Sequence, residues 1–267
     1  MHSVTSIVQD SRPGHESTWY AGTGEQYGIV SQTTFISRFS GNGILKSTDN
    51  GLTWSSLPST ISDTPETYLT SGDMDFVWRM VTDPTDLVND VVLAAVYNGI
   101  YRSDDGGTTW SQVLGFSPFE SDYLDIVVSP TGVFYATLSS EGADKGIYRS
   151  TDGVGWTNIT PSGFVSAYGR LAIAINPLDE NVVWFFGSTS ATTANGHSIY
   201  RYQYLSGDGS GTNGIWDDRS ANLPNQSCYL SEITAEIGLL STQASFDVHI
   251  AVHPTDTASI YIAGTSI

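Results

Sequence analysis

The sequence predicts an all-β fold, a β-propeller of four-stranded blades, and two repeated phrases carry this prediction. The first is a short apolar strand of the type Gly-Ile-Tyr-Arg, followed in the best copies by a Ser-x-Asp-x-Gly-x-Thr-Trp turn. The second is a pair of apolar runs separated by a turn that often contains proline. Short β-branched and aromatic runs between turn residues are typical of strands, and four such strands per repeat are typical of a propeller blade.

The first phrase occurs four times along the chain. The copies begin at Gly43, Gly99, Gly146 and Ser198. The turn is one residue shorter after the third copy and is degenerate after the fourth. We expect the repeated turn residues to be structural, with an Asp side chain that accepts backbone N–H groups, a Gly with a left-handed backbone and a Trp beneath the hairpin. These residues are Ser47, Asp49, Gly51, Trp54, Ser103, Asp105, Gly107, Trp110, Ser150, Asp152 and Trp156.

The second phrase precedes each copy of the first and gives the length of the unit. Examples are Met80–Pro84 before Val91–Ala95, and Ile173–Pro177 before Val182–Phe186. No long stretch has a helical apolar period, so almost no helix is expected. The predicted blades cover approximately residues 3–57, 77–114, 122–160, 168–224 and, in part, 246–267.

The fifth unit stops after its second strand. We therefore expect one incomplete propeller domain over residues 1–267, a fragment of a larger ring of about seven blades. Such an open arc leaves apolar sheet faces bare at both ends, which predicts self-association through these ends.

The composition narrows the possible partners. The formal net charge is −18 from 28 acidic and 10 basic residues, with no basic patch, which argues against a nucleic-acid partner. No apolar run reaches the roughly 18 residues of a transmembrane segment, and Met1–Val4 do not open a signal peptide. Cys228 is the only cysteine, so no internal disulfide is expected.

No metal or cofactor is predicted. The five histidines show no zinc spacing. Asp208, Ser210 and Thr212 have the alternating oxygens of a calcium loop but lack the glycine and closing glutamate of an EF-hand. A plain flexible loop is the expectation there.

Three stretches, Trp19–Glu25, Gly41–Gly51 and Ser103–Trp110, closely resemble the Asp-box (BNR) repeat superfamily. The resemblance covers nearly the whole chain. The superfamily includes sialidases, xyloglucan-cleaving glycosidases, sortilin-type receptor domains and many uncharacterised secreted bacterial proteins, and the chain is most similar to the last group. The resemblance implies a protein that is extracellular, on the cell surface or periplasmic, with a binding face opposite the Asp-box turns. Neither the Arg-Ile-Pro motif of sialidases nor the glycine-rich opening of the xyloglucan enzymes is evident, so no catalytic residue is carried over.

The binding face is expected to carry the long loops and the entry of each inner strand. The loops that do not repeat are residues 24–42, 58–75, 188–197 and 223–245. Aligning the inner strands on their proline turns puts polar residues on one side of each strand, near the central mouth. The ligand-binding candidates are Arg79, Tyr123, Asp125, Arg170, Asp247 and His249, together with Glu25 of the Gly-Thr-Gly-Glu phrase.

These residues leave two interpretations open. They form either a polar funnel for a sugar or peptide, or salt bridges between neighbouring blades. The favoured function is a non-catalytic recognition propeller that binds a glycan or an extracellular protein. The alternative is a glycoside hydrolase, sialidase-like or xyloglucanase-like, with Asp125 and Asp247 as its catalytic candidates. Two free carboxyls about 5–9.5 Å apart would favour the enzyme, and carboxyls held by arginines would favour binding. A third hypothesis assigns the decisive residues to blades outside this chain.

Overall fold

The computed structural model describes residues 3–29, 36–61, 73–116, 121–191, 196–223, 228–229, 236–237 and 247–264. Within these ranges the chain is all-β, and its helical elements are single 3-10 turns. No helix in this part of the chain is long and apolar enough to cross a membrane. The four turns are η1 (Pro58–Thr60), η2 (Asp73–Asp75), η3 (Gly211–Asn213) and η4 (Ser220–Asn222).

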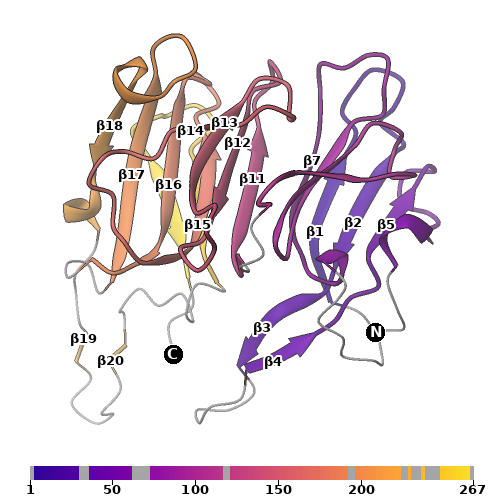
Figure 1. Cartoon of the computed structure of the whole chain (residues 1–267), viewed down its shortest axis with the longest axis horizontal. Coiled ribbons are helices and arrows are strands. Elements are labelled where there is room, and N and C mark those ends of the chain that lie inside the picture. The colour runs from indigo at the N-terminus through magenta and orange to yellow at the C-terminus, as the bar shows by residue number, and fades with distance from the viewer. Residues whose placement is uncertain are drawn as a thin grey trace.

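The strands form four antiparallel four-stranded sheets and a two-stranded fifth sheet, arranged side by side (Figure 1). The first blade contains β1 (Val4–Gln9), β2 (Trp19–Thr23), β5 (Ile44–Ser47) and β6 (Ser55–Ser56). The second contains β7 (Val77–Thr82), β8 (Val92–Val96), β9 (Gly99–Ser103) and β10 (Ser111–Leu114). The third contains β11 (Leu124–Val128), β12 (Phe134–Leu138), β13 (Gly146–Ser150) and β14 (Thr157–Asn158). The fourth contains β15 (Tyr168–Ile175), β16 (Val182–Thr189), β17 (His197–Tyr204) and β18 (Gly214–Asp218), and the fifth contains β21 (His249–Val252) and β22 (Ile260–Ala263).

Two short hairpins stand outside the blades. They are β3 (Glu25–Ile29) with β4 (Ile36–Phe39), and β19 (Cys228–Tyr229) with β20 (Glu236–Ile237). Both project from the same edge of the molecule, the lower edge in Figure 1. The predicted propeller, with four complete blades, a partial fifth and almost no helix, is confirmed.

Apolar side chains between adjacent sheets form the core. The isoleucine of the repeated third strand points toward the following blade, so that Ile100 shares a cluster with Leu124 and Ile126. The adjacent tyrosine points to the preceding blade, because side chains alternate along a strand, and Tyr101 packs against the cluster of the first two blades. Ile44, Ile100 and Ile147 are fully buried, which stabilises the fold by about 1.5–3 kcal/mol for each side chain.

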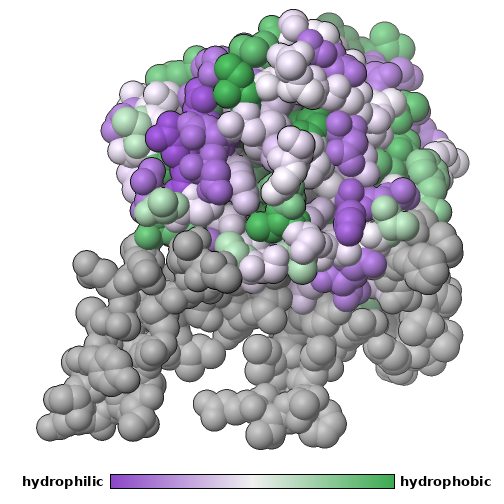
Figure 2. All heavy atoms as spheres, turned by 60° about the vertical axis from the view of Figure 1, so that its left-hand side comes forward, coloured by the Kyte–Doolittle hydropathy of each residue, from purple (hydrophilic) through white to green (hydrophobic). Residues whose placement is uncertain are grey.

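The two end sheets have one unpacked face each. Ile7 of β1 is 59% exposed and Tyr261 of β22 is 58% exposed. No strand pairing joins the first blade to the fifth among the described residues. On the side brought forward in Figure 2, hydrophobic residues emerge as patches between hydrophilic ones. The described part of the ring is therefore open, as expected from the sequence.

Candidate functional site

The repeated turns after the third strands, called Asp-box turns here because they resemble that motif, are closed by their own side chains. Asp105 accepts hydrogen bonds from the backbone N–H of Thr109 at 2.8 Å and from its hydroxyl at 2.7 Å. Ser103 Oγ accepts from the backbone N–H of Gly107 at 2.8 Å and donates to Asp105 at 2.8 Å. The bonds from Thr109 lower the pKa of Asp105 to about 2, and bonds from Thr53 do the same for Asp49 in the first turn.

Two of the three tryptophans of these turns bond to their own hairpins. Trp54 Nε1 donates to the carbonyl of Gly51 at 3.1 Å, and Trp110 Nε1 donates to the carbonyl of Gly107 at 3.2 Å. Trp54, Trp110 and Trp156 are all half-buried. The Ser and Asp side chains of these three turns thus bond to each other within the same turn.

A central cavity of about 280 Å³ lies among the inner strands. All five inner strands contribute to its lining, with Thr5 from β1, Arg79 from β7, Asp125 from β11, Arg170 from β15 and His249 from β21. Four of the residues proposed from the sequence, Arg79, Asp125, Arg170 and His249, are thus brought together. They meet because each inner strand carries its polar side chain on the side facing the axis.

Asp125 is fully buried and has well-placed partners from three blades. Its carboxylate accepts from the backbone N–H of Ile173 on β15 at 2.9 Å and from that of Ile126 at 3.0 Å. Arg79 Nη1 on β7 lies 3.3 Å from Asp125 Oδ2 and also donates to the carbonyl of Ile173. These contacts tie the second, third and fourth blades together, in agreement with the salt-bridge interpretation.

Arg170 is the second cation of the cavity. Its Nη2 lies 3.8 Å from Asp125 Oδ1, and its guanidinium carbon lies 5.2 Å from the ring centre of Trp78. Burial lowers the pKa of Arg170, and the charge of Asp125 opposes this shift. The Nε atom of Arg170 is buried and has no acceptor among the described residues. The negative charge of Asp125 thus lies beside the positive charges of both Arg79 and Arg170.

Three other candidates do not line the cavity. Tyr123 packs against Trp78, with ring centres 5.5 Å apart. Asp247 is half-buried, precedes β21 and contributes an attractive charge to Arg170. Glu25 lies at the start of β3 and accepts from the hydroxyl of Ser3 at 3.3 Å. Among the residues that line the cavity, Asp125 is the only carboxylate.

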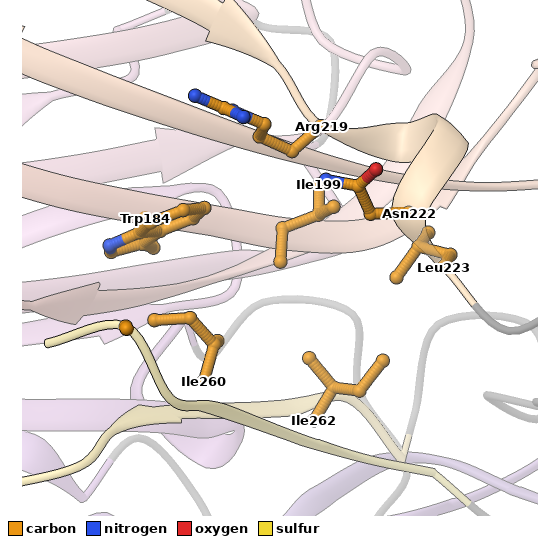
Figure 3. Close-up of a pocket in the computed structure, with 8 residues that line it drawn as sticks. Trp184, Ile199, Arg219, Asn222, Leu223, Ile260 and Ile262 are labelled. Atoms are coloured by element: carbon orange, nitrogen blue, oxygen red, sulfur yellow. The ribbon is translucent and has the colours of Figure 1, made fainter. Parts of the chain in front are cut away.

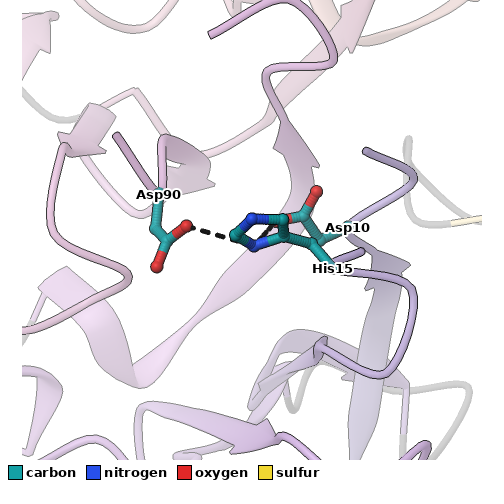
Figure 4. Close-up of side chains that lie close together, drawn as sticks. All are labelled: Asp10, His15 and Asp90. Carbon is teal, nitrogen blue, oxygen red and sulfur yellow. Dashed lines mark ion pairs between the residues drawn. The ribbon is translucent and has the colours of Figure 1, made fainter. Parts of the chain in front are cut away.

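A charged cluster on the edge that carries the Asp-box turns was not anticipated from the sequence. Ligand atoms of Asp10, His15 and Asp90 lie within 4.8 Å of one another (Figure 4). Arg12 already provides the cation, because its Nη2 lies 2.5 Å from Asp10 Oδ2 and 2.7 Å from Asp90 Oδ1. Burial opposes ionisation of Asp10, but hydrogen bonds from Arg12 outweigh it and hold the pKa of Asp10 below its usual range.

The side chain of Arg12 also bonds to backbone carbonyls of the second blade. Its Nη1 donates to the carbonyls of Asp86 at 2.6 Å and Asn89 at 2.7 Å. The cluster is thus a contact between the β1–β2 turn and the β7–β8 turn. In sequence, Asp90 is far from the other members, and no motif pairs these residues.

Polar groups within the glycine-rich loop of the fourth blade bond to one another. Asp208 accepts from the backbone N–H and hydroxyl of Ser210, each at 2.9 Å, and from Asn213 at 3.3 Å. These bonds close a turn, in line with the plain loop expected there. Most of the long loops 58–75 and 223–245, and residues 192–195 of loop 188–197, lie outside the described residues.

The curated proteins that this chain is similar to are xyloglucanases. No family model matches the chain. Xyloglucanase Xgh74A of Acetivibrio thermocellus is 28% identical over 202 residues, which cover 66% of this chain and 23% of that protein. A xyloglucanase of a Paenibacillus species is 30% identical over 160 residues, which cover 50% of this chain and 15% of that protein. The chain spans less than a quarter of the length of these relatives.

Solved structures agree at the level of the fold. The GH74 enzyme of Niastella koreensis superposes with a TM-score of 0.57 at 18% identity, covering 98% of this chain and 44% of that one. An ancestral GH74 enzyme gives a TM-score of 0.58 at 18% identity, covering 96% of this chain and 31% of that one. The chain is therefore a β-propeller, similar in fold to GH74 enzymes, and its curated relatives are xyloglucanases.

Proposed function

We propose that this chain is part of a glycoside hydrolase of the xyloglucanase kind and that its propeller holds a polysaccharide on the face opposite the Asp-box turns. The observation that carries the proposal is the 28% identity over 202 residues to a xyloglucanase. The recognition module favoured by the sequence alone has no comparable support. A polymeric substrate does not enter cells, which supports an extracellular, cell-surface or periplasmic location.

The contacts of Asp125 limit the part that the central cavity can play in catalysis. Glycoside hydrolysis by the usual route needs two carboxyl groups about 5–9.5 Å apart, one of which donates or accepts a proton. Asp125 accepts from two backbone N–H groups and lies beside two arginines, so both of its carboxylate oxygens already have partners. We therefore assign the described cavity to structure and sugar contact, and assign the acid and base to residues outside it.

Retention of the chain in native gels that contain xyloglucan tests polysaccharide binding. We expect xyloglucan to slow the chain, and dextran, a glucan with different linkages, to have no effect. His249→Ala and Glu25→Gln, on the proposed face, should weaken retention. Asp152→Ala, in a turn on the opposite edge, is the matched control and should leave retention unchanged. Equal mobility with and without xyloglucan would exclude the proposed binding face.

A second candidate function is recognition without hydrolysis, and the buried contacts of Asp125 favour it. Release of reducing ends from xyloglucan separates the two. Release that disappears in Asp247→Asn identifies an enzyme that uses this half-buried carboxylate. Retention without release identifies a binding propeller, whose catalytic residues belong to another part of the protein or are absent.

A further inference from the structure

Arg170 is a buried cation with few partners. It is 9% exposed and lines the central cavity. Among the described residues its guanidinium forms no hydrogen bond, because Nε has no acceptor and the ion pair with Asp125 spans 3.8 Å, beyond hydrogen-bond length. A guanidinium has five N–H donors, and a buried charge without partners is costly. The donors of the two Nη atoms are therefore free to meet an acceptor in the cavity.

Arg79, from the second blade, brings further donors to the same cavity. Its side chain is 40% exposed. Its Nη1 is shared between the carboxylate of Asp125, at 3.3 Å, and the carbonyl of Ile173, at 3.3 Å. Its Nε and Nη2 form no hydrogen bond with a described residue. Two guanidiniums thus share one carboxylate and keep unused donors, and such donors pair well with the two oxygens of a second carboxylate.

The described lining of the cavity has an excess of positive charge. With His249 counted as neutral, it contains two cations and one anion, Asp125. Asp247 attracts Arg170 but forms no ion pair with it. This excess contrasts with the formal charge of the whole chain, which is −18. A monoanion in the cavity would balance the lining, whereas a dianion such as phosphate would exceed it.

The surroundings of both arginines come from strands within the chain. Arg170 lies on β15, which contacts the inner strands on its two sides, β11 and β21. Arg79 lies on β7, which contacts β1 and β11. Neither arginine is on the first or the last inner strand, so each has a packed inner strand on both sides. The unused donors therefore do not arise at an end of the row of blades.

A larger groove, of about 470 Å³, lies between the fourth and fifth sheets and differs in character (Figure 3). Its lining is mostly apolar, with Trp184 and Ile199 on the fourth blade and Ile260 on β22. The charged residue in this lining is Arg219, which forms an ion pair with Asp217. Guanidinium donors without partners are thus a feature of the central cavity and not of this larger groove.

We propose that the central cavity binds a carboxylate, which accepts from the Nη groups of Arg170 and from Arg79. The volume of about 280 Å³ is near the lower end for ligand pockets and suits a ligand about the size of one sugar ring. Trp78 and Val248 provide apolar wall for the rest of the ligand. The carboxylate belongs either to a uronic acid unit or to a free organic acid. Xyloglucan has no acidic unit, so the proposal does not depend on the proposed polysaccharide function.

Titration calorimetry of the whole chain with glucuronate, acetate, glucose and phosphate tests the proposal. We expect saturable binding of a carboxylate, and at least about tenfold weaker binding of glucose, which lacks the charge, and of phosphate. Glucuronate that binds about tenfold more tightly than acetate identifies an acidic sugar as the ligand. Acetate that binds at least as tightly as glucuronate identifies a free organic acid. The proposal fails if neither carboxylate binds, or if glucose or phosphate binds as tightly as the better carboxylate.

Variants of the chain locate the carboxylate. Arg79→Gln and Arg170→Gln should each weaken its binding about tenfold or more, because charged donors are lost. Arg219→Gln makes the same change in the groove of Figure 3, is the matched control and should leave binding unchanged. Circular dichroism shows that each variant is folded, and Arg79→Gln, at the more exposed position, carries the test if Arg170→Gln does not fold.

Unchanged carboxylate binding in Arg79→Gln, or an equal loss in Arg219→Gln, would overturn the proposal. Retention by xyloglucan in native gels is a separate measurement. A chain that is retained by xyloglucan but binds no carboxylate disproves this proposal alone.

Discussion

Arg102 on the third strand of the second blade donates a 2.7 Å hydrogen bond to the carbonyl of Asp152 in the turn of the third blade. Lys46 makes the corresponding bond to Gly106 one blade earlier. In the first two blades, the basic residue that ends the repeated third-strand phrase therefore connects consecutive blades, in addition to the apolar contacts of the same strand.

Replacing Arg102 by glutamine should destabilise the chain by about 1–2 kcal/mol, because a charged donor to the next blade is lost. Its ion pair with the exposed Asp104 contributes little to this figure. Urea unfolding measures the change. Lys145→Gln, at an exposed position, is the control and should unfold as the unmodified chain does; equal midpoints for both variants would mean that the contact between blades is energetically unimportant.

Asp105→Ala should cost about 1–3 kcal/mol, because backbone and hydroxyl groups of Thr109 lose their acceptor. The turn lies on the edge opposite the proposed polysaccharide face, so xyloglucan retention should be unchanged. A variant with unaltered stability and lost retention would assign the Asp-box a role in binding.

The same aspartates predict a specific acid response. An unfolded aspartate has a pKa near 3.9, whereas the folded pKa of Asp49 and Asp105 is about 2. Because the folded value is the lower one, the stabilisation is present above about pH 4 and is lost as the pH falls toward about 2. Urea midpoints between pH 5 and pH 2 should decline less steeply for Asp105→Asn than for the unmodified chain. Parallel declines would show that this carboxylate does not govern acid unfolding.

Asp125→Asn should destabilise the chain by about 3–5 kcal/mol, because it leaves the guanidiniums of Arg79 and Arg170 without their buried counter-charge. Thermal and urea unfolding measure the loss. Glu141→Gln, at an exposed position, is the comparison and should be neutral. A small loss for Asp125→Asn would reopen the possibility that the carboxylate is free to act on a ligand.

A chelator should leave the melting temperature unchanged, and added Zn²⁺ should not raise it, because Arg12 occupies the space between Asp10 and Asp90. Arg12→Ala should destabilise the chain by about 3–5 kcal/mol, since a buried aspartate loses its partner. Differential scanning fluorimetry with and without metal checks both results. A Zn²⁺-dependent increase that His15→Ala removes would identify a metal site instead.

The sequence alone was sufficient to predict the structure of a single blade. The alternation of Ile100 and Tyr101 predicts which side chain faces which neighbour, and the spacing of Ser103, Asp105 and Gly107 predicts a self-bonded turn. Both follow from local geometry, in which residues a few positions apart have only a few arrangements.

The sites between blades were less predictable for a physical reason. Alignment of the inner strands places Arg79, Asp125 and Arg170 near one mouth, and the three residues line one cavity. The hydrogen bond from the backbone of Ile173 depends on the offset between two sheets, which the alignment does not give. The contact of Arg12 with Asp90 likewise requires two turns of different blades to meet.

The basic residue at the end of each third strand gives the stack of blades a direction. The first three sheets contact their successors through this side chain, and the second, third and fourth sheets contact their predecessors through a tyrosine. The free energy of opening a sheet therefore depends on which neighbours it has. The second, third and fourth blades have a packed neighbour on both sides among the described residues, whereas the first and fifth have one. Amide protons of the middle sheets should consequently exchange most slowly, and thermal fraying should begin at the two outermost sheets and move inward.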